Sequence, residues 1–399
     1  MTEDAVLILV AGAMLATGVL ASLVAARLRL PALVLFLVLG MAIGSDGLGW
    51  IDFENYVLAR LIGSIALSLI LFEGGLVTGR AGILPVLRPA VALAVVGTAG
   101  TAVVVGLAAG LLFDLTLLEG LLLGAILSPT DGAAVFALLR ASPLRPRLAR
   151  TLEGEAGLND PIAVLLVLTF IELIDRPDYG AFDIFLFFLQ QLGFGALLGV
   201  AIGAVGVMCL TRLDSASAGL NLVASFATAA IAFGAAGVVG GSGFLAVYLA
   251  ALALGSIDLN VKPSLLAFHE GLAAVAEIGM FFTLGLLVFP SQLDGIFVEG
   301  TLLALIIAFI ARPLAAAAAT AFERFTIAER ALLGWTGLRG AVPVVLATFP
   351  VIGEIPRSLE FFNIVFFAVL VSTLIQGSTI ESFATRLGLT QSRAVATAP

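Results

Sequence analysis

Long apolar segments recur along almost the whole chain and are separated by short polar stretches. A window of about 19 residues, roughly the length of a helix that crosses a bilayer, marks thirteen such segments. They cover residues 5–26, 32–43, 58–77, 90–112, 117–139, 152–173, 184–210, 220–239, 243–254, 265–288, 301–321, 331–350 and 361–383. The pattern predicts an all-α polytopic membrane protein with about 13 transmembrane helices, because membrane barrels have shorter, alternating segments.

Composition strengthens this prediction. Of the 399 residues, 61% are hydrophobic and 12% are charged, whereas a soluble domain carries about 25% charged residues. The formal net charge is -8 and no basic run suits a nucleic acid, so we expect no nucleic-acid partner. The lone Cys209 offers neither an intrachain disulfide nor a cysteine-based metal site. His269 is also alone, and the sequence assigns it no role.

The loops between the apolar segments alternate in charge. The first, third and fifth loops carry arginines, and the second, fourth and sixth are acidic. The positive-inside rule therefore places the N-terminus outside and the C-terminus, with Arg386 and Arg393, in the cytoplasm. The first segment lacks a preceding basic region, so we expect a retained helix rather than a cleaved signal. We expect a multi-pass protein of a bacterial-type cell (inner) membrane, with the lipid bilayer as its surroundings.

Two of the segments are interrupted at matching positions. Residues 1–383 are expected to form one transmembrane domain, followed by a short cytoplasmic tail, 384–399. If the chain divides into two halves of opposite orientation, 5–173 and 220–383, with 184–210 as a connector, the breaks at SPTDGA and GLRGAVP coincide. Interrupted helices in inverted repeats point to the binding site of a transporter. Gly and Pro are common in membrane helices, but both breaks carry an ionisable residue, which favours a functional site.

The stretch TLEGEAGLNDPIAVLLVL at Thr151–Leu168 places carboxylates inside an apolar segment. Carboxylates at that depth are costly and usually mark an ion or proton path. Asp160 precedes Pro161, which lacks a backbone donor and so frees a carbonyl. A carboxylate beside free carbonyls suits an alkali cation or a proton, which is the minimum needed for exchange. The alternative is a structural carboxylate that caps a neighbouring helix.

Two further carboxylates are candidates. Asp131 follows Thr130 in the first break, where it is either a ligand or the N-cap of a half-helix that begins at Gly132, or both. Glu73 lies in SLILFEGGL, where it either binds the ion or reaches the interface beside Arg80.

A structural clamp is expected around Glu155 and Asn159, which lie four residues apart and so share one helix face. Arg339, between two glycines in the second break, is the natural partner for Glu155, because a lone buried guanidinium needs a carboxylate. The roles of Glu277 and Arg312, which could pair with each other, stay open.

Five motifs occur in a fixed order: LFEGGL at Leu71–Leu76, SPTDGAAVF at Ser128–Phe136, EAGLNDP at Glu155–Pro161, SGFLAVYLA at Ser242–Ala250 and GLRGAVP at Gly337–Pro343. Together they resemble those of the monovalent cation/proton antiporters of the NhaP type. The potassium/proton branch, which is linked to cell-volume regulation, is the most similar. The resemblance covers essentially the whole chain.

The resemblance implies two inverted six-helix repeats with crossed broken helices, a homodimer, and alternating access. It assigns the alkali cation to Asp160, Asp131 and Glu73, with the Thr130 main-chain carbonyl, and a structural network to Glu155, Asn159 and Arg339. The Asn159–Asp160 pair, in place of two aspartates, resembles the electroneutral branch. Many relatives have Ser where this chain has Ala156. The missing hydroxyl favours K⁺ over Na⁺ as the transported ion, because a larger ion needs less complete coordination. A cytoplasmic regulatory domain, common in the branch, is not seen in this sequence.

Our first hypothesis is a secondary active antiporter that exchanges K⁺ or Na⁺, leaning to K⁺, for H⁺, with roles in pH homeostasis and cell-volume regulation. It is not an enzyme and needs no cofactor; the ions are its substrates. One alternative is a passive cation channel, but no repeated carbonyl filter is evident. Another is a Na⁺-coupled symporter of an organic anion, which Arg339 could bind.

Overall fold

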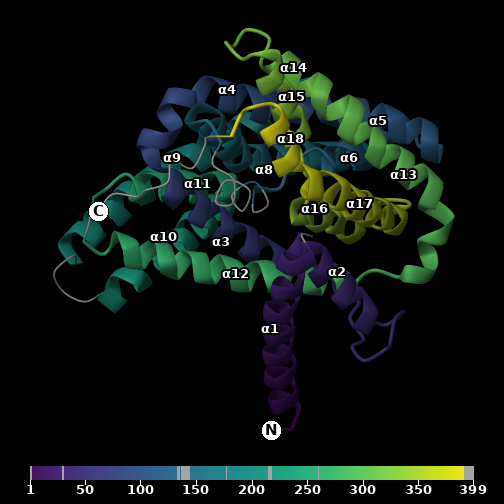
Figure 1. The fold of residues 1–399 in the computed structure, drawn as a ribbon, viewed down its shortest axis with the longest axis horizontal. Coiled ribbons are helices and arrows are strands. Elements are labelled where there is room, and N and C mark those ends of the chain that lie inside the picture. The colour runs from purple at the N-terminus through teal and green to yellow at the C-terminus, as the bar shows by residue number, and fades with distance from the viewer. Residues whose placement is uncertain are drawn as a thin grey trace.

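The computed structural model of the chain describes residues 2–28, 31–132, 135, 144–176, 178–213, 218–258 and 260–390 (Figure 1). The first half of the described chain contains α1 (Thr2–Leu28), α2 (Ala32–Ile43), α3 (Tyr56–Ile83), α4 (Leu87–Ala92), α5 (Thr98–Phe113), α6 (Leu117–Ile126), α8 (Pro146–Asp175) and α9 (Ala181–Leu213). The second half contains α10 (Ala218–Val238), α11 (Gly243–Gly255), α12 (Lys262–Leu286), α13 (Phe297–Ile306), α14 (Arg312–Ala319), α15 (Ile327–Trp335), α16 (Ala341–Ile352), α17 (Ser358–Ser372) and α18 (Ser378–Arg386).

Short 3-10 turns and π-helical segments join or interrupt these helices. The 3-10 turns are η1 (Leu84–Val86), η3 (Pro290–Gln292) and η4 (Asp294–Ile296). The π-helical segments are η2 (Leu93–Gly97), η5 (Ile307–Ala311) and η6 (Thr373–Gly377). Because η2 joins α4 to α5 and η5 joins α13 to α14, each of these pairs runs as one interrupted rod.

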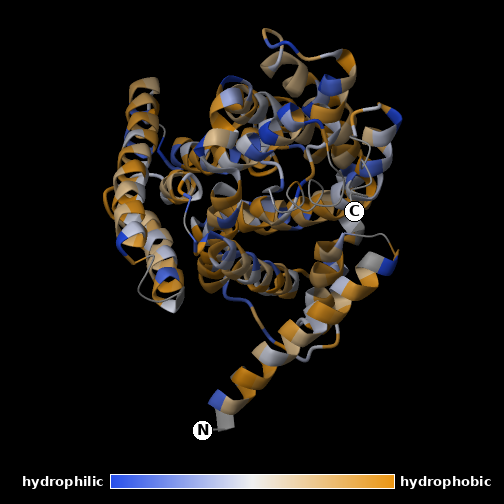
Figure 2. Cartoon of the chain, turned by 60° about the vertical axis from the view of Figure 1, so that its left-hand side comes forward, coloured by the Kyte–Doolittle hydropathy of each residue, from blue (hydrophilic) through white to orange (hydrophobic). Residues whose placement is uncertain are grey.

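The described residues contain 8 helical stretches long and apolar enough to cross a membrane. Four shorter apolar helices, α2, α6, α11 and α16, accompany them. Hydrophobic residues dominate the long helices, including α1, which projects away from the other helices (Figures 1 and 2). These findings confirm the predicted all-helical membrane class, while the number of crossings stays a prediction.

Both predicted interruptions are present. Helix α6 ends at Ile126 and the chain is not helical again until Gly132. Helix α15 ends at Trp335, and α16 begins at Ala341. Residues 133, 134 and 136–139 of the fifth predicted segment lie outside the described residues.

The two interrupted helices also begin alike. The side chain of Thr116 accepts from the Glu119 N–H, and the Glu119 carboxylate accepts from the Thr116 N–H at the start of α6. The same reciprocal capping box opens α15, with Thr326 and Glu329. Each box satisfies backbone donors that the first turn of a helix leaves open.

The helices pack in two groups. We call the first the inner-ring group; it contains α4–α6, α8 and α13–α18. The wall group contains α1–α3 and α9–α12, in which α3 packs on α11 and α12, and α9 packs on α10 and α11. The groups meet where α3 packs against α8 and α16.

Glycines bring α5 and α6 into close backbone contact. A Cβ atom at Gly124 would overlap the Ala102 carbonyl oxygen and meet the Gly106 backbone nitrogen at 2.6 Å. Gly120 faces the backbone of Gly106 in the same way. Small residues at such crossings are the usual means of close packing between membrane helices. This contact holds α6 in place, and the end of α6 is one side of the site described below.

We expect Gly124→Ala to destabilise the protein although alanine is the better helix former. Glycine to alanine normally gains about 1 kcal/mol in a helix, but overpacking against a backbone costs about 1–3 kcal/mol. The matched control is Gly234→Ala on α10, where a Cβ atom meets nothing within 4 Å. Thermal unfolding in detergent should show a lower midpoint for the first variant and an equal or higher midpoint for the second. Equal midpoints for both would contradict the packing argument.

Candidate functional site

The two interrupted helices cross at their non-helical stretches. The Asp131 N–H donates to the Leu338 carbonyl at 2.8 Å, so the backbone of one break is bonded to the backbone of the other. Both stretches are buried. In an apolar interior, an unpaired backbone group is costly, and this bond satisfies one group from each stretch.

Arg339 fills the space beyond the end of α6. Its Nη1 donates to the carbonyls of Ser128 and Pro129, each at 2.7 Å, and its side chain is fully buried. Its own carbonyl accepts from Thr373 Oγ1 at 2.7 Å. A cation at the C-terminal end of a helix opposes the partial negative charge there. Arg339 therefore joins the two breaks, as the clamp hypothesis expected, but it does so through carbonyls.

Asp131 lies at the opposite kind of helix end. A Cβ atom on Gly340, the residue that precedes α16, would overlap the Asp131 carboxylate. The carboxylate therefore lies directly against the backbone at the N-terminal end of α16. That end carries partial positive charge and favours an anion. Any side chain at position 340 would displace Asp131.

Asp160 and Asp131 line one small cavity, which has room for about one water molecule. Asp160 is 4% exposed, and its Oδ1 has no hydrogen-bond partner among the described residues. A buried acceptor without a partner calls for an explanation, such as a bound ion or proton. The remaining lining residues are Gly132, Ala341 and Val342 from the inner-ring group and Leu67, Ile70, Leu71, Met280 and Phe281 from the wall group.

Asn159, which precedes Asp160, is fully buried and donates from Nδ2 to Thr130 Oγ1 at 2.5 Å. This bond ties α8 to the first break, one residue before Asp131. It sets the position of the first break relative to the part of α8 that carries Asp160. The Thr130 side chain is thereby engaged, and its main-chain carbonyl as an ion ligand stays a prediction.

The expected ion pair between Glu155 and Arg339 is wrong. Glu155 Oε1 lies 2.6 Å from Arg312 Nη2, and both side chains are about 1% exposed. Arg312 Nη2 also donates to the Leu333 carbonyl near the end of α15, at 3.2 Å. Spacing along α8 indicates which face Glu155 lies on, but it does not show which neighbouring helix that face meets. The signal that could have found Arg312 was the residue itself, since an arginine within an apolar segment is a functional or pairing residue by default.

Glu73 does not line the cavity that holds Asp131 and Asp160. It is buried in α3, with 6% of its surface exposed, and lies within electrostatic range of Glu153 on α8. The structure therefore brings together two of the three expected ion-binding carboxylates and leaves the third nearby, beside another acid. Its predicted role as a direct ligand is not supported by this geometry.

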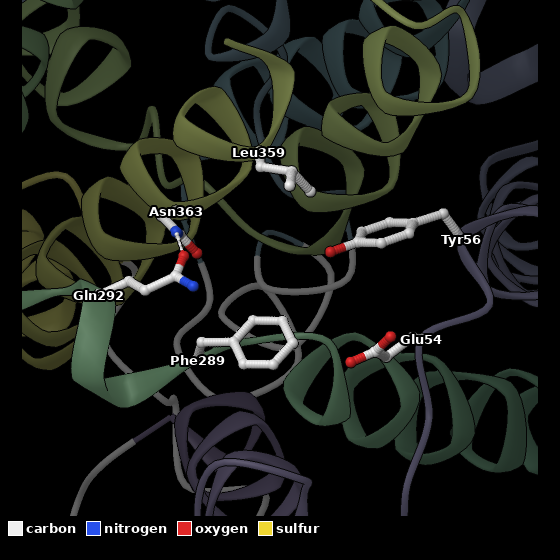
Figure 3. Close-up of a pocket in the computed structure, with 6 residues that line it drawn as sticks. All are labelled: Glu54, Tyr56, Phe289, Gln292, Leu359 and Asn363. Atoms are coloured by element: carbon white, nitrogen blue, oxygen red, sulfur yellow. Dashed lines mark hydrogen bonds between the residues drawn. The ribbon is translucent and has the colours of Figure 1, made fainter.

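A second hollow, of about 350 Å³, lies between the two helix groups and is drawn in Figure 3. It contains neither Asp131 nor Asp160. Asn363 donates to Gln292 across it at 2.8 Å, and the Tyr56 ring stacks edge-on against Phe362 at 5.6 Å. Its lining residues are Glu54, Tyr56, Phe289, Gln292, Leu359 and Asn363. Because neither carboxylate lines it, we regard the hollow as separate from the carboxylate site.

A polytopic helical membrane protein with buried carboxylates at the crossing of two interrupted helices is the class that this fold and site define. The model of the family described as "Sodium/hydrogen exchanger, transmembrane" matches residues 12–386, and the chain belongs to that family. The match confirms the family resemblance that the five sequence motifs predicted.

Curated relatives agree with this family. The K(+)/H(+) antiporter NhaP2 of Shewanella sp. (strain MR-4) is 40% identical over 377 residues, covering 94% of this chain and 66% of that protein. The K(+)/H(+) antiporter NhaP of Alkalimonas amylolytica is 40% identical over 386 residues, covering 96% of this chain and 67% of that protein. This chain thus spans about two thirds of the length of these relatives.

The fold is also found among solved structures. The sodium proton antiporter MjNhaP1 from Methanocaldococcus jannaschii at pH 8 matches with a TM-score of 0.83. The match covers 96% of this chain and 99% of that chain, at 23% identity. At this identity the match establishes a shared fold.

Glu155→Gln should destabilise the protein strongly, because it leaves the buried Arg312 guanidinium without a counter-charge. Loss of one partner of a buried ion pair costs about 3–5 kcal/mol. The control is Glu360→Gln, which removes the partner of the partly exposed Arg357 and should cost no more than about 1 kcal/mol. Thermal unfolding in detergent measures both.

A double variant sharpens this test. Glu155→Gln combined with Arg312→Met removes the unpaired charge, so its unfolding midpoint should lie above that of Glu155→Gln alone. A midpoint for Glu155→Gln as close to the wild-type value as that of Glu360→Gln would rule out a structural role for the pair.

Proposed function

We propose that the protein is a secondary active antiporter that exchanges a monovalent cation, K⁺ or Na⁺ with a preference for K⁺, for H⁺. The observation that carries this proposal is the buried pair of Asp160 and Asp131 at the helix crossing, with Asp160 Oδ1 lacking a hydrogen-bond partner among the described residues. A carboxylate in this state takes up either a proton or a partly dehydrated alkali cation. Because both occupy the same oxygen atoms, binding of one releases the other.

The charges around the crossing support a one-for-one, electroneutral exchange. Two buried guanidinium groups, Arg312 and Arg339, stand beside three buried carboxylates, Glu155, Asp131 and Asp160. This set carries one surplus negative charge, which one proton or one monovalent cation neutralises. A buried cluster with a net charge is costly. The empty site is therefore less stable than the site with a bound proton or the site with a bound cation.

The preference for K⁺ is argued from the relatives and from one residue of this chain. The curated relatives at 40% identity are named as K(+)/H(+) antiporters, whereas the Na(+)/H(+) antiporter ApNhaP of Aphanothece halophytica is 28% identical over 391 residues. Ala156, one turn before Asp160 on α8, supplies no hydroxyl, which suits an ion that needs less complete coordination. Asp131 and the Thr130 carbonyl serve as ligands beside Asp160 in this proposal. Glu73 acts at a distance from them.

The proposed architecture is a pair of inverted repeats, 5–173 and 220–383, with α9 as the connector. The matching capping boxes at Thr116 and Thr326 support it, as do the π-helical segments η2 and η5, which occupy equivalent places. The N-terminus lies outside and the C-terminus lies in the cytoplasm, and two copies form a homodimer. Alternating access moves the inner-ring group along the wall group.

Asp160→Asn should abolish exchange and leave a folded protein, because an uncharged amide takes up neither ion. Purified protein in liposomes with an internal pH dye is challenged with K⁺ and, separately, Na⁺, with an ionophore to clamp the voltage. The control is Asp175→Asn, an exposed residue at the far end of α8, which should retain wild-type exchange. Exchange by Asp160→Asn at the wild-type rate would refute the mechanism, and no response of the wild type to either ion would refute the function.

Proton and cation should compete. As pH falls, protons occupy Asp160 more often, so the K⁺ concentration for half-maximal exchange should rise, by at most about tenfold per pH unit for two ligands of one site. The maximal rate at saturating K⁺ should change much less. Initial rates over a matrix of K⁺ and pH measure both, and a half-maximal concentration independent of pH would show that the two ions bind separately.

A further inference from the structure

A second acid lies on the same face of α8 as Asp160. Glu153 precedes Asp160 by seven residues, two helical turns, which places it about 10 Å nearer the beginning of the helix. Glu153 is half-buried, and among the described residues its carboxylate accepts one long hydrogen bond, from Thr78 Oγ1 at 3.4 Å. Glu73 of α3 lies within electrostatic range. This face of α8 therefore carries carboxylates at two depths.

Tyr248 of α11 contacts α8 between the levels of Glu153 and Asp160. A Cβ atom on Gly157, between Glu153 and Asp160 on the same face, would overlap the Cε2 and Cζ atoms of the Tyr248 ring. Cζ is the carbon that carries the hydroxyl, so the polar end of the tyrosine reaches this strip of α8. The side chain is fully buried, and its hydroxyl has no hydrogen-bond partner among the described residues.

A buried tyrosine hydroxyl normally has a partner. The Tyr248 hydroxyl lies within electrostatic range of Glu153. The Tyr248 ring packs against Gly157, which has no side chain to occupy this space. The nearby cation, Arg150, is exposed and one turn closer to the start of α8. Glu153 thus lies near one solvent-screened positive charge and near one tyrosine hydroxyl without a hydrogen-bond partner among the described residues.

We propose that Glu153 and the Tyr248 hydroxyl form a second cation station, which receives a partly hydrated monovalent cation on its way between the start of α8 and Asp160. The Glu153 carboxylate supplies charge, and the hydroxyl supplies an oxygen ligand or orients a water of the ion. This proposal rests on the antiport function proposed above.

The station predicts an effect on apparent affinity rather than on turnover. In everted membrane vesicles, where the beginning of α8 faces the medium, Glu153→Gln should raise the K⁺ concentration for half-maximal exchange by about fivefold, as expected for loss of one partly screened charge. The maximal rate should stay within about twofold. Tyr248→Phe should act in the same direction and more weakly, because it removes a ligand without removing charge.

Two variants separate this station from general damage to α8. Glu153→Asp keeps the charge and should stay near the wild-type affinity. Glu172 is an acid of similar burial at the other end of the same helix, where it pairs with Arg176 at 3.2 Å. Glu172→Gln should also keep an apparent K⁺ affinity near that of the wild type. Size-exclusion profiles and unfolding midpoints in detergent confirm that all variants are folded.

The outcomes distinguish the two proposals. If the wild type exchanges K⁺ for H⁺ and Glu153→Gln has unchanged apparent affinity, the station is wrong while the antiport mechanism stands. The station is also wrong if Glu153→Gln and Glu153→Asp lose affinity equally, because charge would then not matter. Lack of exchange by the wild type overturns the antiport proposal, and the station with it.

Discussion

The ends of two interrupted helices have to be stabilised inside an apolar protein, and the rest of the site depends on how this is done. The last carbonyls of α6 and α15 have no partner within their own helices, and water is scarce at that depth. Arg339 donates to the carbonyls of Ser128 and Pro129, and Arg312 donates to that of Leu333. A guanidinium suits this task because it offers several donors in one plane and keeps its charge. The arginines therefore satisfy carbonyls at or just beyond both helix ends, together with Gln376, which donates to the Trp335 carbonyl at 3.1 Å.

This polar network belongs to one side of the molecule. The bonds from Arg339, Asn159 and Arg312 all run between members of the inner-ring group. The wall group contributes only apolar side chains to the cavity, from α3 and α12. Sliding of one group on the other would therefore leave the bonds of the site intact and change only what covers it. Such a division supports alternating access, because the cost of exposing the site is mainly that of remaking apolar contacts.

Sequence predicted the parts of this arrangement that depend on local chemistry. Glycine and proline mark both breaks, and carboxylates in apolar segments identified Asp131 and Asp160, which line one cavity. The partner of Glu155 was predicted wrongly, because spacing on α8 gives a direction but not the helix that lies there. Arg312 follows a π-helical segment, which shifts the face on which later residues lie, and no sequence period shows that shift. The hydroxyl of Tyr248 was missed for a similar reason, since its position beside Gly157 depends on how α11 packs.

The two acids of the cavity differ in what neutralises them, and this difference indicates which one exchanges its ligand. Asp131 lies against Gly340 at the positive end of α16, and its N–H is bonded to Leu338. Its charge is therefore favoured by the fold itself, whatever occupies the cavity. Asp160 lies within a long helix, where no such end is available. In the proposed exchange, its charge is compensated by an arriving ion or removed by a proton. On this proposal the interrupted helices supply a fixed field, and the long helix α8 supplies the group whose state changes.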